Sequence, residues 1–313
     1  MRIVFMGAAE FSVPALERLI FGEHQLVAVY TQPDKPAGRG RALAFSPVKG
    51  VAQEHGLEVR QPKSFDQPTD LEFLTELRPD VIVVAAFGKI LPQEVLTIPL
   101  FGCINLHPSL LPRHRGPSPI PGAILAGDEW SGVSIMLMEE GVDCGPILSR
   151  RRVAIEPQDT TGSLTAKLAQ IAAELLEETL PLWLSRSLTP QPQGEGATYT
   201  RLLSKGEGEI DWHLPAPQIW RRVRAFNPWP SSYTRWQGKA FKIHEAALLP
   251  VRLAEGGEPG RVIKLAGGEV GVQTGEGVLR LLRVQLEGRR AVSAAEFVRG
   301  QRGFIGALLP SLK

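Results

Sequence analysis

The chain has 313 residues, 43% of them hydrophobic and 22% charged, the balance of a globular protein with enough apolar surface for about two domains. Two cysteines are too few for a disulfide framework or a four-cysteine zinc site. The sequence shows no signal peptide and no apolar run long enough to cross a bilayer, so we expect a cytoplasmic protein without a membrane segment.

The net charge is only +2, but it is unevenly distributed along the chain. Residues 206–313 contain 16 Lys and Arg against 10 Asp and Glu, whereas residues 1–205 contain 19 against 23. A basic C-terminal part on a mildly acidic N-terminal part favours a polyanionic partner.

The chain opens with a strand–turn–helix–strand pattern. The apolar run 2–6 predicts a buried parallel strand, Gly7 turns the chain, and Ser12 is expected to cap a helix that has Pro14 in its first turn. Residues 25–31 predict a second strand. This opening is Rossmann-like, but it lacks GxGxxG, which disfavours a nicotinamide cofactor.

Residues 32–46 form a long connection rich in proline, glycine and positive charge. Lys35, Arg39 and Arg41 lie in it, and loops of this length are usually functional or disordered. One interpretation is a basic arm that grips a phosphate backbone. The other is a solvated surface loop whose charges are incidental.

The middle of the N-terminal part predicts a mostly parallel sheet covered by helices on both faces. Residues 80–86 are a continuous apolar strand, typical of such a sheet. Ligands bind beyond the carboxyl ends of these strands, and Phe87, Gly88 and Leu91 follow this one. Further strands are expected at 103–106, 132–138 and 147–153, and helices at 48–55, 70–77, 120–126 and 163–184.

The C-terminal part has a different pattern. Residues 185–208 have the Pro, Gln, Gly and Ser content of a linker. A helix over 217–226 carries Arg221, Arg222 and Arg224, and short alternating segments separated by glycines follow it. Several short strands with turns between them predict a small β-barrel.

The polar residues with the clearest chemical potential lie in and after two predicted strands. Asn105 and His107 are two apart on a strand and therefore point the same way, and Asp143 follows the strand 132–138. An amide N–H can stabilise an oxygen that becomes negative, an imidazole can donate to it or move a proton, and a carboxylate can orient the imidazole. This set suits attack on a carbonyl without a covalent enzyme intermediate, and it resembles no metal motif.

Each of these residues also has an ordinary structural interpretation. His107 precedes a proline and can be a satisfied core histidine, Asn105 can be a turn residue, and Asp143 can be a loop acid next to glycine. Cys103 shares a strand face with Asn105 and His107, so a thiol nucleophile is a further alternative, although buried cysteines are common.

The stretches NLHPSLLPRHRG (105–116) and GVSIMLMEEGVDCGPIL (132–148) resemble the formyltransferases that use 10-formyltetrahydrofolate. The resemblance runs nearly end to end. QPDKPAGRGRAL in the basic loop, together with ATYT, IDW and RAFNPWP further on, narrows it to the methionyl-tRNA branch of that family. Three places depart from the family pattern: Gly7-Ala8-Ala9 after the first strand, Pro117-Ser118 after Gly116, and His114, where the family often has an aromatic residue.

The resemblance implies a doubly wound, Rossmann-like formyltransferase domain over 1–188, a linker over 189–208 and an OB-like β-barrel that binds tRNA over 209–313. It places Asn105, His107 and Asp143 at the catalytic positions. The formyl donor and co-substrate would be 10-formyltetrahydrofolate, with no metal, and initiator methionyl-tRNA the acceptor of a monomeric enzyme. The folate candidates are Phe87, Gly88, Leu91, Ser109, Leu110, Leu111, Pro112 and Val142, and the tRNA candidates are Lys35, Arg39, Arg41, Arg221, Arg222 and Arg224.

Three rival functions remain at this point. The acceptor can be a nucleotide sugar or glycinamide ribonucleotide, neither of which needs a basic loop or a second basic domain. Water can replace the amine, giving hydrolysis of formyltetrahydrofolate. The chain can also be a tRNA-binding module with a dead site, against which the intact Asn105, His107 and Asp143 argue.

Overall fold

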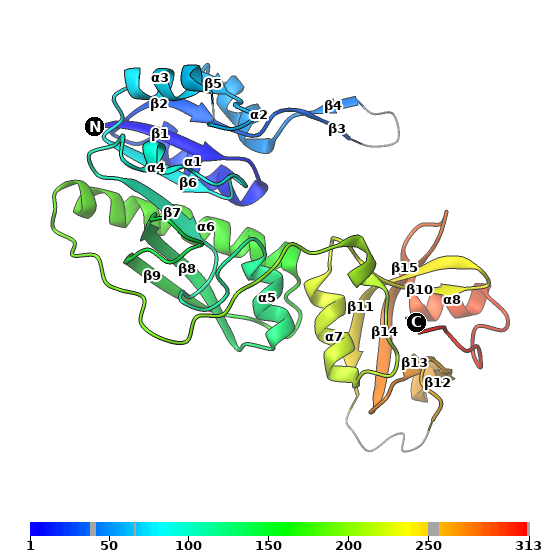
Figure 1. Cartoon of the computed structure of the whole chain (residues 1–313). Coiled ribbons are helices and arrows are strands. Elements are labelled where there is room, and N and C mark those ends of the chain that lie inside the picture. Colours follow the sequence, from blue (N-terminus) through cyan, green and yellow to red (C-terminus); the bar gives the residue numbers. More distant parts are fainter. Residues whose placement is uncertain (38–41, 66, 250–256, 312–313) are drawn as a thin grey trace. The chain divides into compact units, whose positions relative to one another are not determined.

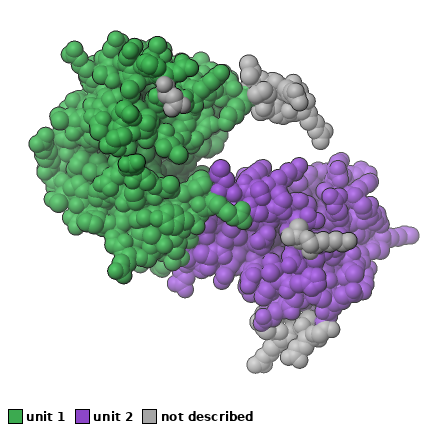
Figure 2. Space-filling model, viewed as in Figure 1, with its two compact units in different colours: residues 1–119, 130–154, 164–201 green, residues 120–129, 155–163, 202–313 purple. Residues whose placement is uncertain are grey.

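The computed structural model describes all residues except 38–41, 66, 250–256 and 312–313. Its internal contacts divide the chain into two compact units (Figure 2). Unit 1 comprises Met1–Pro119, Trp130–Ala154 and Leu164–Arg201, and unit 2 comprises Ile120–Glu129, Ile155–Ser163 and Leu202–Lys313. Within the described ranges, no helix has both the length and the apolar character needed to span a membrane.

Unit 1 contains a seven-stranded sheet in the order β5-β2-β1-β6-β7-β8-β9 (Figure 1). Strands β5, β2, β1, β6 and β7 pair in parallel, and β8 and β9 are antiparallel to their neighbours. The predicted mostly parallel sheet is therefore confirmed. The strands are β1 (Arg2–Gly7), β2 (Gln25–Tyr30), β5 (Val59–Arg60), β6 (Val81–Ala85), β7 (Cys103–His107), β8 (Trp130–Leu137) and β9 (Ile147–Ala154).

Five helices follow the expected positions to within a few residues: α1 (Val13–Ile20), α2 (Pro47–Glu54), α3 (Pro68–Glu76), α5 (Pro119–Ala126) and α6 (Thr161–Leu184). A further short helix, α4 (Gln93–Leu96), was not predicted. One face of the sheet packs against α3 and α4, because alternate strand residues such as Val4, Ile82 and Cys103 share a core with Leu74 and Val95. Every residue of β6 is buried, as its continuous apolar run predicts.

The turn after β1 corrects one expectation. Ser12 does not cap α1 with its side chain; its hydroxyl instead donates to the Ala85 carbonyl oxygen at 2.5 Å. This contact draws the turn close to the end of β6. A Cβ on Gly7 would lie 2.9 Å from the Ser12 Cβ and 3.0 Å from the Ala85 oxygen, so the close approach requires glycine here.

The predicted basic loop contains a short antiparallel hairpin of β3 (Lys35–Ala37) and β4 (Ala42–Ala44). Arg39 and Arg41 lie outside the described residues, and Lys35 is exposed. A polar cluster fixes the base of the hairpin: Lys49 pairs with Asp34 at 2.6 Å, and the Gln61 amide donates to Asp34 at 2.8 Å. These two contacts lower the pKa of the Asp34 carboxyl.

Unit 2 is built on an antiparallel sheet in the order β10-β11-β14-β13-β12, with β15 paired to β14. Its apolar core includes Trp212, Phe241, Phe297 and Phe304. The predicted short strands of this part are confirmed, whereas β15 and α8 were not predicted. The elements of this unit are α7 (Ala216–Ala225), β10 (Ser232–Trp236), β11 (Lys239–Leu248), β12 (Val262–Lys264), β13 (Val270–Gln273), β14 (Val278–Leu286), β15 (Val292–Ser293) and α8 (Ala294–Gly300). Short 3₁₀ turns lie at Glu10–Ser12 in unit 1 and at Lys205–Gly208 and Ala266–Gly268 in unit 2.

Candidate active site

Strand β7 places three chemically interesting side chains on one face of the sheet. Cys103, Asn105 and His107 alternate onto the face that α3 and α4 cover. Cys103 lies in the core, where its thiol points to the Val95 carbonyl oxygen at 3.8 Å. Burial raises the pKa of this thiol to about 12, so it stays protonated and does not fit the alternative of a nucleophile.

Asp143 reaches the same face by a route that the sequence did not indicate. Strand β8 runs antiparallel to β7, and its last residue, Leu137, pairs with Ile104 near the start of β7. The loop 138–146 therefore returns over the face of the sheet. It brings an Asp143 carboxylate oxygen 3.6 Å from His107 Nδ1, and the other accepts from Asn105 Nδ2 at 3.4 Å.

The loop after β7 supplies the second partner of the imidazole. His107 Nε2 lies 3.0 Å from the His114 carbonyl oxygen, and the Gly116 amide donates to Asp143 at 2.7 Å. Gly116 has a φ of +96°, and a Cβ there would lie 2.6 Å from the Thr200 carbonyl oxygen. Glycine is therefore required at the point where this loop binds the carboxylate.

Two opposing effects act on the proton of His107. The side chain is buried, with 4% of its surface exposed, and burial lowers the pKa of the imidazole from its ordinary value. The Asp143 carboxylate and the His114 carbonyl both favour the charged form and oppose this shift. Because each ring nitrogen faces an acceptor, a neutral ring can donate to one of them, whereas a protonated ring can donate to both.

The arrangement joins an amide N–H, a buried imidazole and a carboxylate at one place on the sheet. The Cys103 thiol is protonated, so the geometry suits attack by an external nucleophile on a carbonyl bound near the Asn105 amide and the His107 imidazole. Among the residues that the structure describes, no group of three His, Cys, Asp or Glu is placed to hold a metal ion.

The folate candidates lie in loops that follow β6, β7 and β8. Phe87 and Leu91 are buried in the core. Their side chains therefore anchor the loop 86–92 and do not form part of its exposed surface. Gly88 has a φ of +71°, and the Gln32 amide donates to the Phe87 carbonyl oxygen at 3.0 Å. Val142 is 54% exposed next to Asp143 and offers the apolar contact surface.

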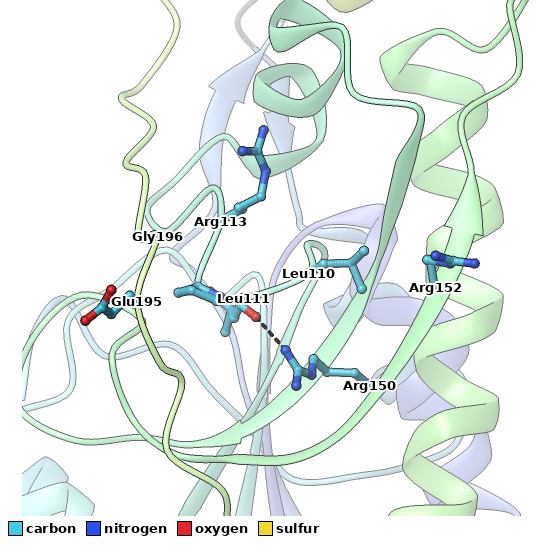
Figure 3. Close-up of a pocket in the computed structure, with 8 residues that line it drawn as sticks. Leu110, Leu111, Arg113, Arg150, Arg152, Glu195 and Gly196 are labelled. Atoms are coloured by element: carbon cyan, nitrogen blue, oxygen red, sulfur yellow. Dashed lines mark hydrogen bonds between the residues drawn. The ribbon is translucent and has the colours of Figure 1, made fainter.

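The turn 109–112 is fixed from below by β8. The Ser134 hydroxyl donates to the Ser109 carbonyl oxygen at 2.7 Å and accepts from the Leu111 amide at 3.1 Å. A hollow of about 490 Å³ opens beside this turn (Figure 3). Its lining includes three folate candidates but none of the three catalytic candidates: Leu110, Leu111, Pro112, Arg113, Arg150, Arg152, Glu195 and Gly196.

The tRNA candidates on α7 differ in their surroundings. Arg224 is only 9% exposed and donates to the Asp159 and Glu156 carbonyl oxygens, each at 2.7 Å. It is therefore a packing residue, and its predicted role as a tRNA contact is corrected. Arg222 donates to the Glu207 carbonyl oxygen at 2.7 Å, and Arg221 lies against Gly127, where a Cβ would lie 2.3 Å from its guanidinium carbon. Both remain partly exposed.

The structure also identifies residues that the sequence analysis did not select. Gln193, Thr198 and Thr200 bind the loops that carry Asp143 and the His114 carbonyl. The two threonines lie in ATYT, which we used only as a mark of the family. Gln193 belongs to no motif. Its hydrogen-bond partners are far away in the sequence, so no local pattern could have identified its role.

Two family profiles match the chain and define its class. The Formyl transferase profile matches residues 1–180, and the profile of the formyl transferase C-terminal domain matches residues 202–302. The first covers more than half of the chain, in the part that contains Asn105, His107 and Asp143. The class is that of the formyltransferases.

A relative in Dehalococcoides mccartyi, named methionyl-tRNA formyltransferase, is 48% identical over 99% of this chain and 98% of its own length. A relative of the same name in Methylococcus capsulatus is also 48% identical, over 95% and 96%. This chain therefore belongs to the methionyl-tRNA formyltransferase family.

Among solved structures, HypX from Aquifex aeolicus in complex with tetrahydrofolic acid is similar, with a TM-score of 0.61 at 19% identity. The match covers 98% of this chain but 48% of the HypX chain, so this chain spans about half of that protein. At this identity the likeness shows a shared fold.

Proposed function

We propose that the protein transfers the formyl group of 10-formyltetrahydrofolate to the α-amino group of methionine on initiator tRNA. The observation that carries the proposal is the convergence of Asn105, His107 and Asp143 on one face of β7, in a chain that belongs to the methionyl-tRNA formyltransferase family. The folate-bound structural relative supports the same donor.

The nucleophile requires little activation. An α-amino group titrates near ~7.7–8.0, so much of it is neutral at physiological pH. When bound, the formyl donor supplies an electrophilic carbonyl carbon. The amine nitrogen forms a bond to this carbon, the bond from the carbon to the folate nitrogen then breaks, and tetrahydrofolate leaves. Asn105 donates an N–H to the oxygen that gains negative charge, and His107 donates a second hydrogen bond or moves the proton from the attacking amine toward the leaving folate nitrogen. Asp143 orients the imidazole and stabilises its charged form.

The proposed folate site combines the loops after β6, β7 and β8. The backbone of 87–91 and the turn Ser109–Pro112 would form two walls, with Phe87, Leu91 and Leu111 supporting them from the core. Val142 would contact the pteridine from the Asp143 loop. Two features support this site. The exposed apolar side chain of Val142 is adjacent to Asp143, and Asp143 contacts the buried imidazole of His107.

We propose that tRNA is held by positive charge in two regions. Lys35 with Arg39 and Arg41 would contact the acceptor end, and unit 2, with Arg221 and Arg222, the rest of the molecule. The formyltransferase domain would span 1–188, the linker 189–208 and the tRNA-binding domain 209–313. The enzyme would act as a monomer in the cytoplasm, where charged tRNA is available.

The test is an assay with methionyl-initiator tRNA and 10-formyltetrahydrofolate, followed by mass analysis of the released aminoacyl group. We expect the mass to increase by one formyl group, and much more slowly on methionyl-elongator tRNA. Formylation of a nucleotide sugar in place of the tRNA would overturn the assignment of acceptor. Loss of the donor's formyl group without any acceptor would indicate a hydrolase.

A further inference from the structure

A segment between α6 and unit 2 runs along the two loops of the candidate site. At one end, the backbone N–H of Gln191 donates to the Ile147 carbonyl oxygen at 2.9 Å, and the backbone carbonyl of Gln191 accepts from the Ile147 N–H at 2.7 Å. At the other end the Arg115 amide donates to the Thr198 oxygen at 2.9 Å, and the Thr200 amide to the Arg115 oxygen at 2.7 Å. The 191–200 segment therefore adds an irregular strand to the loop after β7.

Gln193 is the buried side chain of this segment, with 8% of its surface exposed. Its amide nitrogen donates to the carbonyl oxygens of Asp143 and Gly145, at 2.8 and 2.7 Å. Its oxygen accepts from Arg115 Nε and Nη2, at 3.1 and 2.7 Å. A single side chain thus connects the loop that carries Asp143 with the loop after β7, and both donors and both acceptor positions of its amide are used.

The two threonines of the segment hold the second loop. The His114 amide donates to the Thr198 hydroxyl at 2.8 Å, and the Thr200 hydroxyl donates to the Arg115 carbonyl oxygen at 2.9 Å. The carbonyl of His114 is the group that faces His107 Nε2. Both acceptors of the imidazole, this carbonyl and the Asp143 carboxylate, are therefore fixed by residues 193–200.

Asp143 needs such support. It has a φ of +48°, which is uncommon for a residue other than glycine. A strained residue keeps its conformation only where surrounding contacts determine it. Two of those contacts are the Gly116 amide on its carboxylate and Gln193 on its backbone oxygen.

We propose that Gln193 is a positioning residue of the formyl transfer, holding Asp143 and the His114 carbonyl against His107. This inference rests on the proposed function. Gln193 touches none of the reacting atoms; it acts through Asp143 and Arg115. Because a misplacement of about 1 Å can cost on the order of 100-fold in rate, loss of this one amide reaches the chemistry without removing a catalytic group.

The test compares Gln193→Met with Gln191→Met. Methionine is neutral and of similar length, so Gln193→Met removes these four hydrogen bonds, and the weaker one from the amide nitrogen to Met136 Sδ at 3.8 Å, without adding a charge. Gln191 is a matched control, because its side chain is exposed and donates only to the nearby Thr189 carbonyl oxygen. We expect Gln193→Met to lower kcat by about 10- to 100-fold with the KM values of both substrates within about twofold, and Gln191→Met to leave both unchanged.

A second variant separates the two connections of the amide. Gln193→Glu keeps an acceptor for Arg115 but loses both donors to the Asp143 and Gly145 carbonyls, so we expect it to lose kcat as Gln193→Met does. Wild-type kcat in Gln193→Glu would overturn the inference, as would a rise in KM with kcat unchanged in Gln193→Met.

A readout independent of activity distinguishes this inference from the proposed function. The groups that face His107 are the Asp143 carboxylate and the His114 carbonyl and ring, and the carboxylate favours the charged imidazole. In Gln193→Met we expect the His107 signal, followed by NMR and assigned with His107→Gln, to titrate at lower pH than in the wild type. An unchanged titration would overturn the inference even if the wild type formylates no tRNA.

Discussion

Burial and hydrogen bonding have opposite effects on the pKa of His107. Desolvation favours the neutral ring, whereas an acceptor at each nitrogen favours the charged ring. In the proposed reaction, a carbonyl oxygen that becomes negative would add a further charge that favours a proton on this ring. The surroundings of His107 would then strengthen its hydrogen bond as charge develops on the substrate, which is the condition for stabilising a transition state in preference to the ground state.

Removing either donor should slow turnover without weakening tRNA binding. We expect Asn105→Ala and His107→Ala each to lower kcat by ~10²–10³, the usual cost of one donor to a developing oxyanion. The measurement is kcat for formylation together with tRNA affinity by filter binding. His55→Ala is the control, because that ring is exposed and makes only an edge contact with Phe21. Near-normal turnover in both site variants would refute the assigned roles.

The pH profile should respond to the charge of Asp143. The carboxylate raises the pKa of His107 against the effect of burial, so Asp143→Asn should lower that pKa further. Less of the ring is then protonated at any given pH, and the alkaline limb of kcat should move to lower pH. The asparagine can still accept from the Gly116 amide, which preserves the loop. A limb that stays in place, or moves to higher pH, would contradict a role for the protonated ring.

At the scale of the elements, the sequence predicts what depends on local pattern. The buried run of β6, the alternation of β10 to β14 and the shared face of Asn105 and His107 all follow from side-chain periodicity. The path of the loop 138–146 does not, since it depends on β8 pairing antiparallel to β7. Gln193 is out of reach for the same reason, because its partners lie 48 and 50 residues away.

Helix α7 shows why charge alone misidentifies a binding residue. Arg221, Arg222 and Arg224 look alike in the sequence, but helical geometry turns Arg224 inward, onto the Asp159 and Glu156 carbonyls and over the Trp220 ring at 4.3 Å. The guanidinium of Arg224 donates to main-chain carbonyl oxygens within unit 2, so its charge does not face the solvent.

Arg224→Ala should therefore destabilise the protein rather than weaken tRNA binding. Two buried carbonyl oxygens would lose a charged donor, and hydrogen bonds to charged groups contribute about 1.5–3 kcal/mol each, so we expect the free energy of unfolding to fall by about 3 kcal/mol or more. Urea denaturation measures this. Arg235→Ala on β10 is the control, because that side chain is exposed. A variant of normal stability with weakened tRNA affinity would restore the original interpretation.

At the scale of the whole molecule, the proposed catalytic groups and the excess positive charge belong to different parts of the chain. Asn105, His107 and Asp143 all lie in unit 1, whereas residues 206–313 carry the surplus of Lys and Arg. A small formyl donor needs one shaped site, but a tRNA is a long polyanion whose affinity grows with the number of phosphates neutralised. The basic hairpin loop is the exception, because it adds positive charge to the unit that contains the proposed catalytic groups.

The loop should therefore account for a measurable part of the salt dependence. Replacing Lys35, Arg39 and Arg41 with glutamine should flatten the slope of log affinity against log salt by about 0.9 for each duplex phosphate that the loop no longer neutralises, while formylation at saturating tRNA persists. The measurement is a tRNA titration across a series of salt concentrations. The matched control replaces three exposed arginines elsewhere in unit 1, Arg18, Arg78 and Arg186, and removes the same charge. An equal change in both triple variants would mean that net charge alone sets the slope, and an unchanged slope in the loop variant would make the loop an incidental surface feature.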